Sequence, residues 1–173
     1  WFLALDAEID LTGPRAPRSH VPLRDLYLGY KQLAKQPEEI ITAVRFKKPT
    51  GDFRFNFEKV CKRTYLDIAT VNTAISINVE RLACGTLAIQ SAHVAAGGVA
   101  PVPLYLKETS AFLGGKEISE ETISVASEIM QSEISPISDV RGTETYKRLL
   151  LAQLFQAHFV ELFATEFTEG TEK

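Results

Sequence analysis

The order of strand-type and helix-type patterns most constrains the fold of this chain. The segments with strand-type alternation all lie in about its first hundred residues. We expect strands over 1–11, 38–46, 53–61, 68–79 and 85–94. Helix-type patterns follow over 103–113, from Ser119 and from about Thr143. Strands first and helices afterwards predict an α+β fold, in which helices cover one face of an antiparallel sheet.

The second part of the chain has its own core pattern. A three-stranded antiparallel sheet from residue 53 onwards should be covered by three helices, and "KKPTGD" reads as a turn between two subdomains. Ser119 is the expected N-cap of the second helix. The last helix, about 33 Å long at about 1.5 Å per residue, should cross the whole domain. Its predicted inward stripe is Tyr146, Leu150, Leu154, Ala157 and Val160.

The expected strand 53–61 carries an unusual lysine. Phe53, Phe55 and Phe57 should lie on one side as an apolar core face, and the next residue on that side is Lys59. An inward-facing cation needs a negative or electron-rich partner, or a route to water. From the pattern alone, a lysine that extends past the sheet edge is the commoner arrangement. A lysine that meets a bound group is the alternative.

Other candidate residues point to structure rather than chemistry. Asp139 and Arg141 can pair across the polar turn before the last helix, and the Gly97-Gly98 pair suits a turn at a strand end. His158 is expected in the core or an interface. We find no catalytic arrangement and no phosphate-binding glycine loop in the sequence.

Composition excludes several function classes. The 173 residues carry a net charge of −3 and no long apolar run, so neither a nucleic-acid partner nor a membrane span is expected. Cys61 and Cys84, in no CxxC, read as reduced cytosolic thiols and are too few for an iron–sulfur cluster. His20, His93 and His158 are isolated, so no metal site is predicted.

Four segments, in order, resemble the FAD-binding domain of xanthine dehydrogenases in the molybdenum hydroxylase family. They are "LRDLYLGYKQLAKQPEEIITAVRF", "KVCKRTYLDIATVNTAISI", "GGVAPVP" and "SPISDVRGTETYKRLL". The second is similar to the family's K-x-x-K/R-R-x-x-x-DI-A-x-V segment. PEE and SPISDVRG favour the small subunit of a bacterial enzyme, which carries iron–sulfur and FAD domains.

The resemblance implies a domain division. Residues 1–48 correspond to the end of the FAD-binding second subdomain, and residues 53–167 to the C-terminal α+β subdomain. We expect a fragment of a larger protein, because the family's glycine-rich pyrophosphate loop has no counterpart in this sequence. Two family flavin contacts map onto Ile41 and Lys59, as cofactor-binding residues. The loop from Val60 to Thr70 resembles the family's mobile loop beside the flavin, which governs access of the nicotinamide.

The resemblance also implies a role. The chain would be the flavin-carrying portion of a cytoplasmic xanthine dehydrogenase, an enzyme that passes electrons from iron–sulfur clusters to FAD and on to NAD. Its partners would be the rest of the small subunit and a molybdopterin-binding large subunit, so 2Fe–2S clusters and molybdopterin lie outside this chain. The alternatives are a related flavoprotein acting on carbon monoxide, an aldehyde or an aromatic substrate, and a non-catalytic interaction module.

Overall fold

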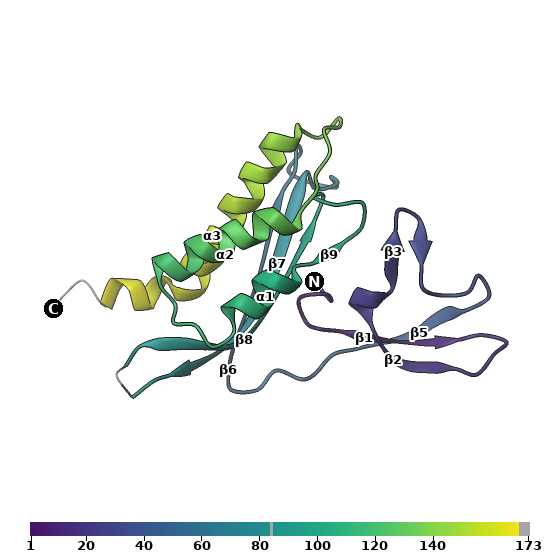
Figure 1. The fold of residues 1–173 in the computed structure, drawn as a ribbon, viewed down its shortest axis with the longest axis horizontal. Helices are drawn as coiled ribbons and strands as arrows, with labels where there is room; N and C mark the ends of the chain where they lie inside the picture. The colour runs from purple at the N-terminus through teal and green to yellow at the C-terminus, as the bar shows by residue number, and fades with distance from the viewer. Residues whose placement is uncertain (84, 170–173) are drawn as a thin grey trace.

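The computed structural model describes residues 1–83 and 85–169 and confirms the α+β class, with antiparallel sheets first and three helices afterwards (Figure 1). The expectation of a reduced thiol at Cys84 falls outside the described residues. Figure 1 shows the helices gathered on one face of the longest sheet and the small first sheets on its other side. Residues 46–51 join the two parts, and the division of the chain into two subdomains stays a prediction.

The first part of the chain is a small β unit. Its three-stranded antiparallel sheet has the order β2-β1-β5, from Glu8–Thr12 (β1), Arg18–Pro22 (β2) and Ile40–Arg45 (β5). A 3-10 turn, Leu23–Asp25, leads into a hairpin of Tyr27–Gly29 (β3) and Gln32–Leu33 (β4). The strand expected at 38–46 is therefore confirmed. Strand β2 lies in a region for which the sequence pattern predicted no strand.

The strand predicted from Trp1 is wrong at its start. The backbone N–H of Leu5 donates to the oxygen of Trp1 at 3.1 Å, and Asp6 has a φ of +48°, so the chain turns before β1 begins at Glu8. The turn is stabilised by packing, because Leu3 and Ala4 are buried against the open face of the longest sheet. Tertiary packing has overridden the local alternation.

The longest sheet contains Asp52–Val60 (β6), Val71–Arg81 (β7), Leu87–Gly97 (β8) and Leu104–Tyr105 (β9), in that order and all antiparallel. The three expected strands are present, and β9 adds a short fourth one. Residues 104–105 were expected to be helical. Their backbone pairs with Ala95 and Ala96 instead.

The helices are Lys107–Leu113 (α1), Glu120–Glu133 (α2) and Glu144–Glu169 (α3), the last with a kink at Phe163. The expected cap is present, since the Ser119 hydroxyl accepts a hydrogen bond from the Thr122 backbone N–H at 3.1 Å. Helix α3 packs over β6 and β7, and α1 packs over β8. Helix α2 lies against both other helices.

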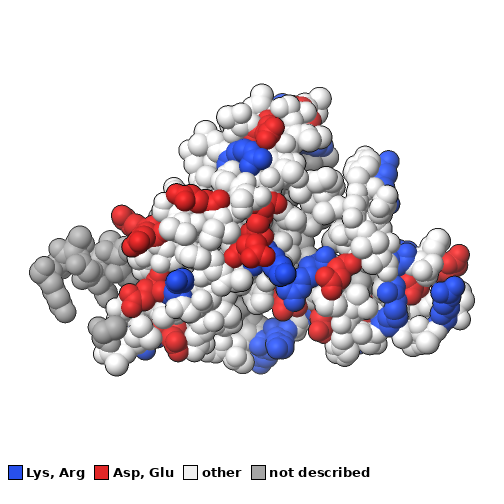
Figure 2. All heavy atoms as spheres, in the orientation of Figure 1, with Lys and Arg blue, Asp and Glu red and all other residues white. Residues whose placement is uncertain are grey.

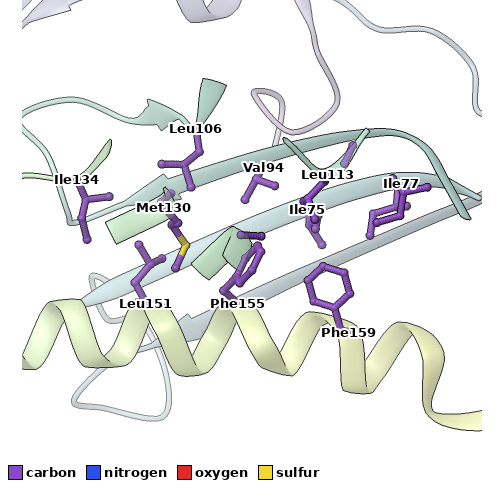
Figure 3. Packing of buried hydrophobic residues seen from close by; sticks show 14 of the residues in the cluster. Ile75, Ile77, Val94, Leu106, Leu113, Met130, Ile134, Leu151, Phe155 and Phe159 are labelled. Atoms are coloured by element: carbon purple, nitrogen blue, oxygen red, sulfur yellow. The ribbon is translucent and has the colours of Figure 1, made fainter. Parts of the chain in front are cut away.

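The main core lies between the sheet and these helices (Figure 3). Its largest fully buried side chains include Ile75, Ile77, Ile89, Leu106, Leu113, Met130, Leu151, Phe155 and Phe159. The stripe predicted for α3 is right in its middle, where Leu150 is buried and Leu154 packs against the core, and wrong at its two ends. Tyr146 is 44% exposed and Val160 60% exposed, whereas their neighbours Lys147 and Phe159 are buried. The larger phenylalanine side chains bury more apolar area and so set the helix's orientation.

The phenylalanine face of β6 does not belong to this core. Phe55 and Phe57 pack against a separate small cluster around Leu3 and Ala4. The opposite face of β6 meets α3, where Arg54 donates to the backbone oxygen of Leu162 at 2.6 Å. The prediction of an apolar face was correct, but its partner is the N-terminal turn rather than the helical layer.

Candidate functional site

Lys59 lies near the end of β6, opposite Asn72 of β7, and is exposed. Its Nζ donates a hydrogen bond to the backbone oxygen of Asp67 at 2.8 Å. Because Lys59 is exposed, the structure shows the commoner arrangement, in which the lysine side chain reaches water. An ammonium has three N–H donors, so further donors remain available for an external acceptor.

The loop that follows Lys59 is short and tightly folded. The backbone N–H of Arg63 donates to the Asp67 carboxylate at 2.8 Å, and the Arg63 guanidinium pairs with it at 3.3 Å. This backbone hydrogen bond, reinforced by the guanidinium, lowers the pKa of Asp67 below its ordinary value. Asp67 thus closes the loop with its carboxylate and binds Lys59 with its carbonyl oxygen.

The tip of this loop is apolar and faces solvent. Leu66 is 99% exposed with a φ of +49°, and Tyr65 and Ile68 are also exposed. A non-glycine residue with positive φ is uncommon and carries a conformational cost. The loop therefore presents apolar side chains beside the cation of Lys59.

Ile41, the second candidate, lies in a different sheet. It is on β5, opposite Leu11 of β1, and is 45% exposed. Both β5 and β6 are edge strands of their sheets. The structure thus presents one apolar and one cationic side chain on two edge strands, and their common role at a flavin stays a prediction.

A cleft of about 690 Å³ separates the first sheet from the open face of the longest sheet, and its lining was not anticipated as a site. Polar side chains of β7 and β8 line one wall, and they bond to other groups of the protein. Asn78 donates to Ser91 at 3.0 Å, and His93 bonds to the Tyr105 hydroxyl at 2.8 Å. Burial lowers the pKa of His93. These side chains are satisfied internally, whereas the lining of the cleft also includes the basic residues Arg45, Lys47 and Lys48.

Other kinds of site find no support in the part of the chain that the structure describes. No three His, Cys, Asp or Glu side chains come together as metal ligands within residues 1–83 and 85–169. Over the same residues, no helix combines the length and hydropathy needed to cross a bilayer. On the face shown in Figure 2, basic and acidic side chains of the described residues are interspersed.

Comparison with known proteins gives the class. The family model described as the CO dehydrogenase flavoprotein C-terminal domain matches residues 57–162. The chain therefore belongs to this family. Members of this family are flavoproteins of the molybdenum hydroxylases, whose cofactor is FAD and whose complexes also carry 2Fe–2S clusters and molybdopterin.

Individual relatives agree with this class. The chain is 31% identical over 143 residues to the carbon monoxide dehydrogenase medium chain of Afipia carboxidovorans, covering 83% of this chain and 47% of the relative. It is 30% identical over 158 residues to xanthine dehydrogenase 1 of Arabidopsis thaliana, covering 90% of this chain and 12% of the relative. The chain spans about half the length of the first of these relatives and a smaller share of the second.

A solved structure supports the fold. Carbon monoxide dehydrogenase from Hydrogenophaga pseudoflava matches with a TM-score of 0.82 and 25% identity, over 94% of this chain and 54% of that chain. The α+β arrangement is thus that of known flavoprotein subunits in this family.

The residues present fit part of a flavin site. An exposed cation at Lys59 and an exposed apolar side chain at Ile41 are the chemistry that a flavin's polar edge and flat ring require. The diphosphate needs clustered backbone N–H donors, and the sequence contains no glycine-rich loop to supply them. A flavin contact at Lys59 and Ile41 would therefore be to the ring side of the cofactor, and it stays a prediction.

Proposed function

We propose that this chain is the flavin-carrying portion of a xanthine dehydrogenase, part of an enzyme that takes electrons from iron–sulfur clusters to FAD and on to NAD. The observation that carries the proposal is Lys59 on an edge strand, directly before the segment from Val60 to Thr70 that resembles the family's flavin-side loop. After Val60, the last residue of β6, this segment forms the largely exposed loop 61–70. The 30% identity to the Arabidopsis xanthine dehydrogenase supports the same assignment. Bound FAD would supply the exchange between one-electron donors such as iron–sulfur clusters and a two-electron acceptor such as NAD.

Lys59 has the role of a positive charge at the flavin edge. A unit charge near a protein surface contributes about 1–4 kcal/mol to a neighbouring charge at about 4 Å. The hydrogen bond to Asp67 limits where the ammonium can go without neutralising it. The positive charge of Lys59 therefore stabilises added electron density on the group that it faces.

Ile41 has the role of an apolar contact for the ring. Its side chain is partly exposed on β5, and the strand's pairing with β1 fixes its direction. Covering an exposed isoleucine contributes favourably through buried apolar area. We assign the diphosphate contacts to residues outside this chain.

Loop 61–70 has the role of controlling access of NAD. Its Arg63–Asp67 pair closes the loop, and its exposed Leu66 and Ile68 are apolar. The proposed partners are the rest of an iron–sulfur and FAD small subunit and a molybdopterin-binding large subunit, in the cytoplasm.

A second candidate is the flavoprotein subunit of a carbon monoxide dehydrogenase. It is favoured by the 31% identity to the Afipia medium chain and by the description of the matching family. A non-catalytic interaction module is the remaining alternative.

The test uses the full-length subunit purified with its complex. Reduction of NAD is followed after addition of xanthine or of carbon monoxide. The proposal expects xanthine to drive NAD reduction and carbon monoxide to have no effect. Activity with carbon monoxide alone would replace the first candidate by the second. A purified complex without flavin would overturn both and leave the interaction module.

A further inference from the structure

Two sequence segments far from loop 61–70 converge on its end. Thr70 is the last residue of the loop, and its backbone N–H donates a hydrogen bond to the Val60 oxygen at 2.8 Å. Gly98 lies against the same residue with a φ of +83°, and a Cβ there would be 2.3 Å from the Thr70 oxygen. No side chain fits at that distance. The Gly97-Gly98 pair therefore allows the end of β8 to pack directly against Thr70.

The turn 135–142 contacts the loop from another segment of the chain. The Thr70 hydroxyl donates to the Arg141 oxygen at 3.5 Å, and Lys62 Nζ donates to the Val140 oxygen at 2.6 Å. Lys62 is near the loop's start and Thr70 is its end. The turn therefore holds both ends of loop 61–70.

The turn itself is held by a buried lysine of α3. Lys147 is only 2% exposed, and its Nζ lies 2.9 Å from the Asp139 carboxylate and 2.8 Å from the Ile137 oxygen. The other carboxylate oxygen of Asp139 accepts from the Arg141 backbone N–H at 2.8 Å. The carboxylate thus links Lys147 to the segment that bonds Thr70. Hydrogen bonds to charged groups in such a site are among the stronger ones.

We propose that the Lys147–Asp139 pair is a positioning pair for the flavin-side loop. The chain of contacts runs from Lys147 through Asp139 to the turn, from the turn to Lys62 and Thr70, and from the loop's Asp67 oxygen to Lys59. Neither residue touches a reacting group. Their role in nicotinamide access rests on the proposed function, whereas their role in holding the loop does not.

The test compares variants of the full-length protein in its complex. Lys147→Met removes the cation and keeps an apolar stem of similar length, and Asp139→Asn keeps an acceptor for Arg141 but loses the charge. Arg148→Met is the matched control. Arg148 lies next to Lys147 and donates to backbone oxygens of Gln131 and Ile134, outside the turn's contacts with the loop.

The first measurement is hydrogen–deuterium exchange of the peptide that spans residues 61–70. Lys147→Met and Asp139→Asn should raise its exchange rate by about tenfold or more, the size expected for losing a hydrogen bond to a charged group. Arg148→Met should leave that rate unchanged. Unchanged exchange in both test variants, or an equal rise in the control, overturns the positioning pair.

The second measurement separates positioning from general destabilisation. With NAD as acceptor, Lys147→Met should raise KM for NAD about threefold to tenfold and change kcat less, and Lys147→Arg should restore most of the loss. Raised exchange with unchanged NAD kinetics would keep the loop clamp and reject its link to nicotinamide access. A wild-type complex that shows no flavin-dependent reduction of NAD would instead count against the proposed function.

Discussion

Lys59 donates a hydrogen bond to the backbone oxygen of Asp67, 2.8 Å away, across the base of an exposed loop. The strand's charged end and the loop that follows it are thus one structural unit. Asp67 uses its carbonyl oxygen for the lysine and its carboxylate for Arg63. A change at either end of the loop is therefore expected to reach Lys59.

The separate location of the phenylalanine face predicts unequal costs of truncation. Phe57 is half-buried and meets Trp1 edge-on at 5.2 Å, whereas Phe155 is fully buried in the main core. Phe155→Ala should lower the free energy of unfolding by about 3–5 kcal/mol, and Phe57→Ala by about 1–2 kcal/mol. Urea unfolding of both variants measures this difference. Equal losses would mean that Phe57 belongs to the main core after all.

Buried His158 predicts a loss of stability in acid. Its Nε2 lies 3.4 Å from the Thr73 hydroxyl, its Nδ1 has no hydrogen-bond partner among the described residues, and burial lowers its pKa from 6.5 to about 4. The unfolded state therefore binds a proton at higher pH than the folded state. The stability contribution of neutral His158 is fully present above pH 6.5 and is lost progressively as pH falls toward 4.

The loss in the free energy of unfolding follows from the lowered pKa of His158. At about 1.4 kcal/mol per pKa unit, it amounts to about 3 kcal/mol in total. Urea unfolding at pH 7, 5 and 4 should show this slope in the wild type and a much smaller one in His158→Leu. The same slope in both proteins would assign the acid sensitivity to other groups.

The strands of the longest sheet and the cap of α2 were predictable because local patterns determine them. Alternation over 71–81 and the serine before two glutamates at Ser119 are signals that tertiary contacts reinforce. The phase of α3 was not predictable from a single stripe. Apolar residues lie on more than one side of that helix, and the sheet selects the side with Phe155 and Phe159.

The candidate site was predictable only in part. The alternation in β6 placed Lys59 at the end of an apolar face, and its exposure follows from that position. The clamp on Thr70 was not visible, because its parts come from residues 97–98 and 135–142 and meet only after the chain folds. The turn at Trp1 was missed for the same reason, since its burial depends on a distant sheet.

The chain on its own should fold but bind FAD weakly. The buried residues of the main core, among those described, all come from residues 71–163, whereas the sequence supplies no glycine-rich loop for the diphosphate. Isothermal titration of the 173-residue chain with FAD should give a dissociation constant well above micromolar. Submicromolar binding would mean that the phosphate site lies within these residues.

The assignment of Lys59 to the flavin edge is tested most directly by the reoxidation of flavin in the reduced full-length complex after rapid mixing with NAD. Lys59→Met should slow this step about tenfold, about 1.4 kcal/mol of lost charge interaction. Oxidation of xanthine with an artificial acceptor at the molybdenum site should stay unchanged, and Lys107→Met, which removes an exposed lysine of α1, should change neither rate. Unchanged reoxidation by NAD in Lys59→Met, or an equal loss of both activities, would contradict the account.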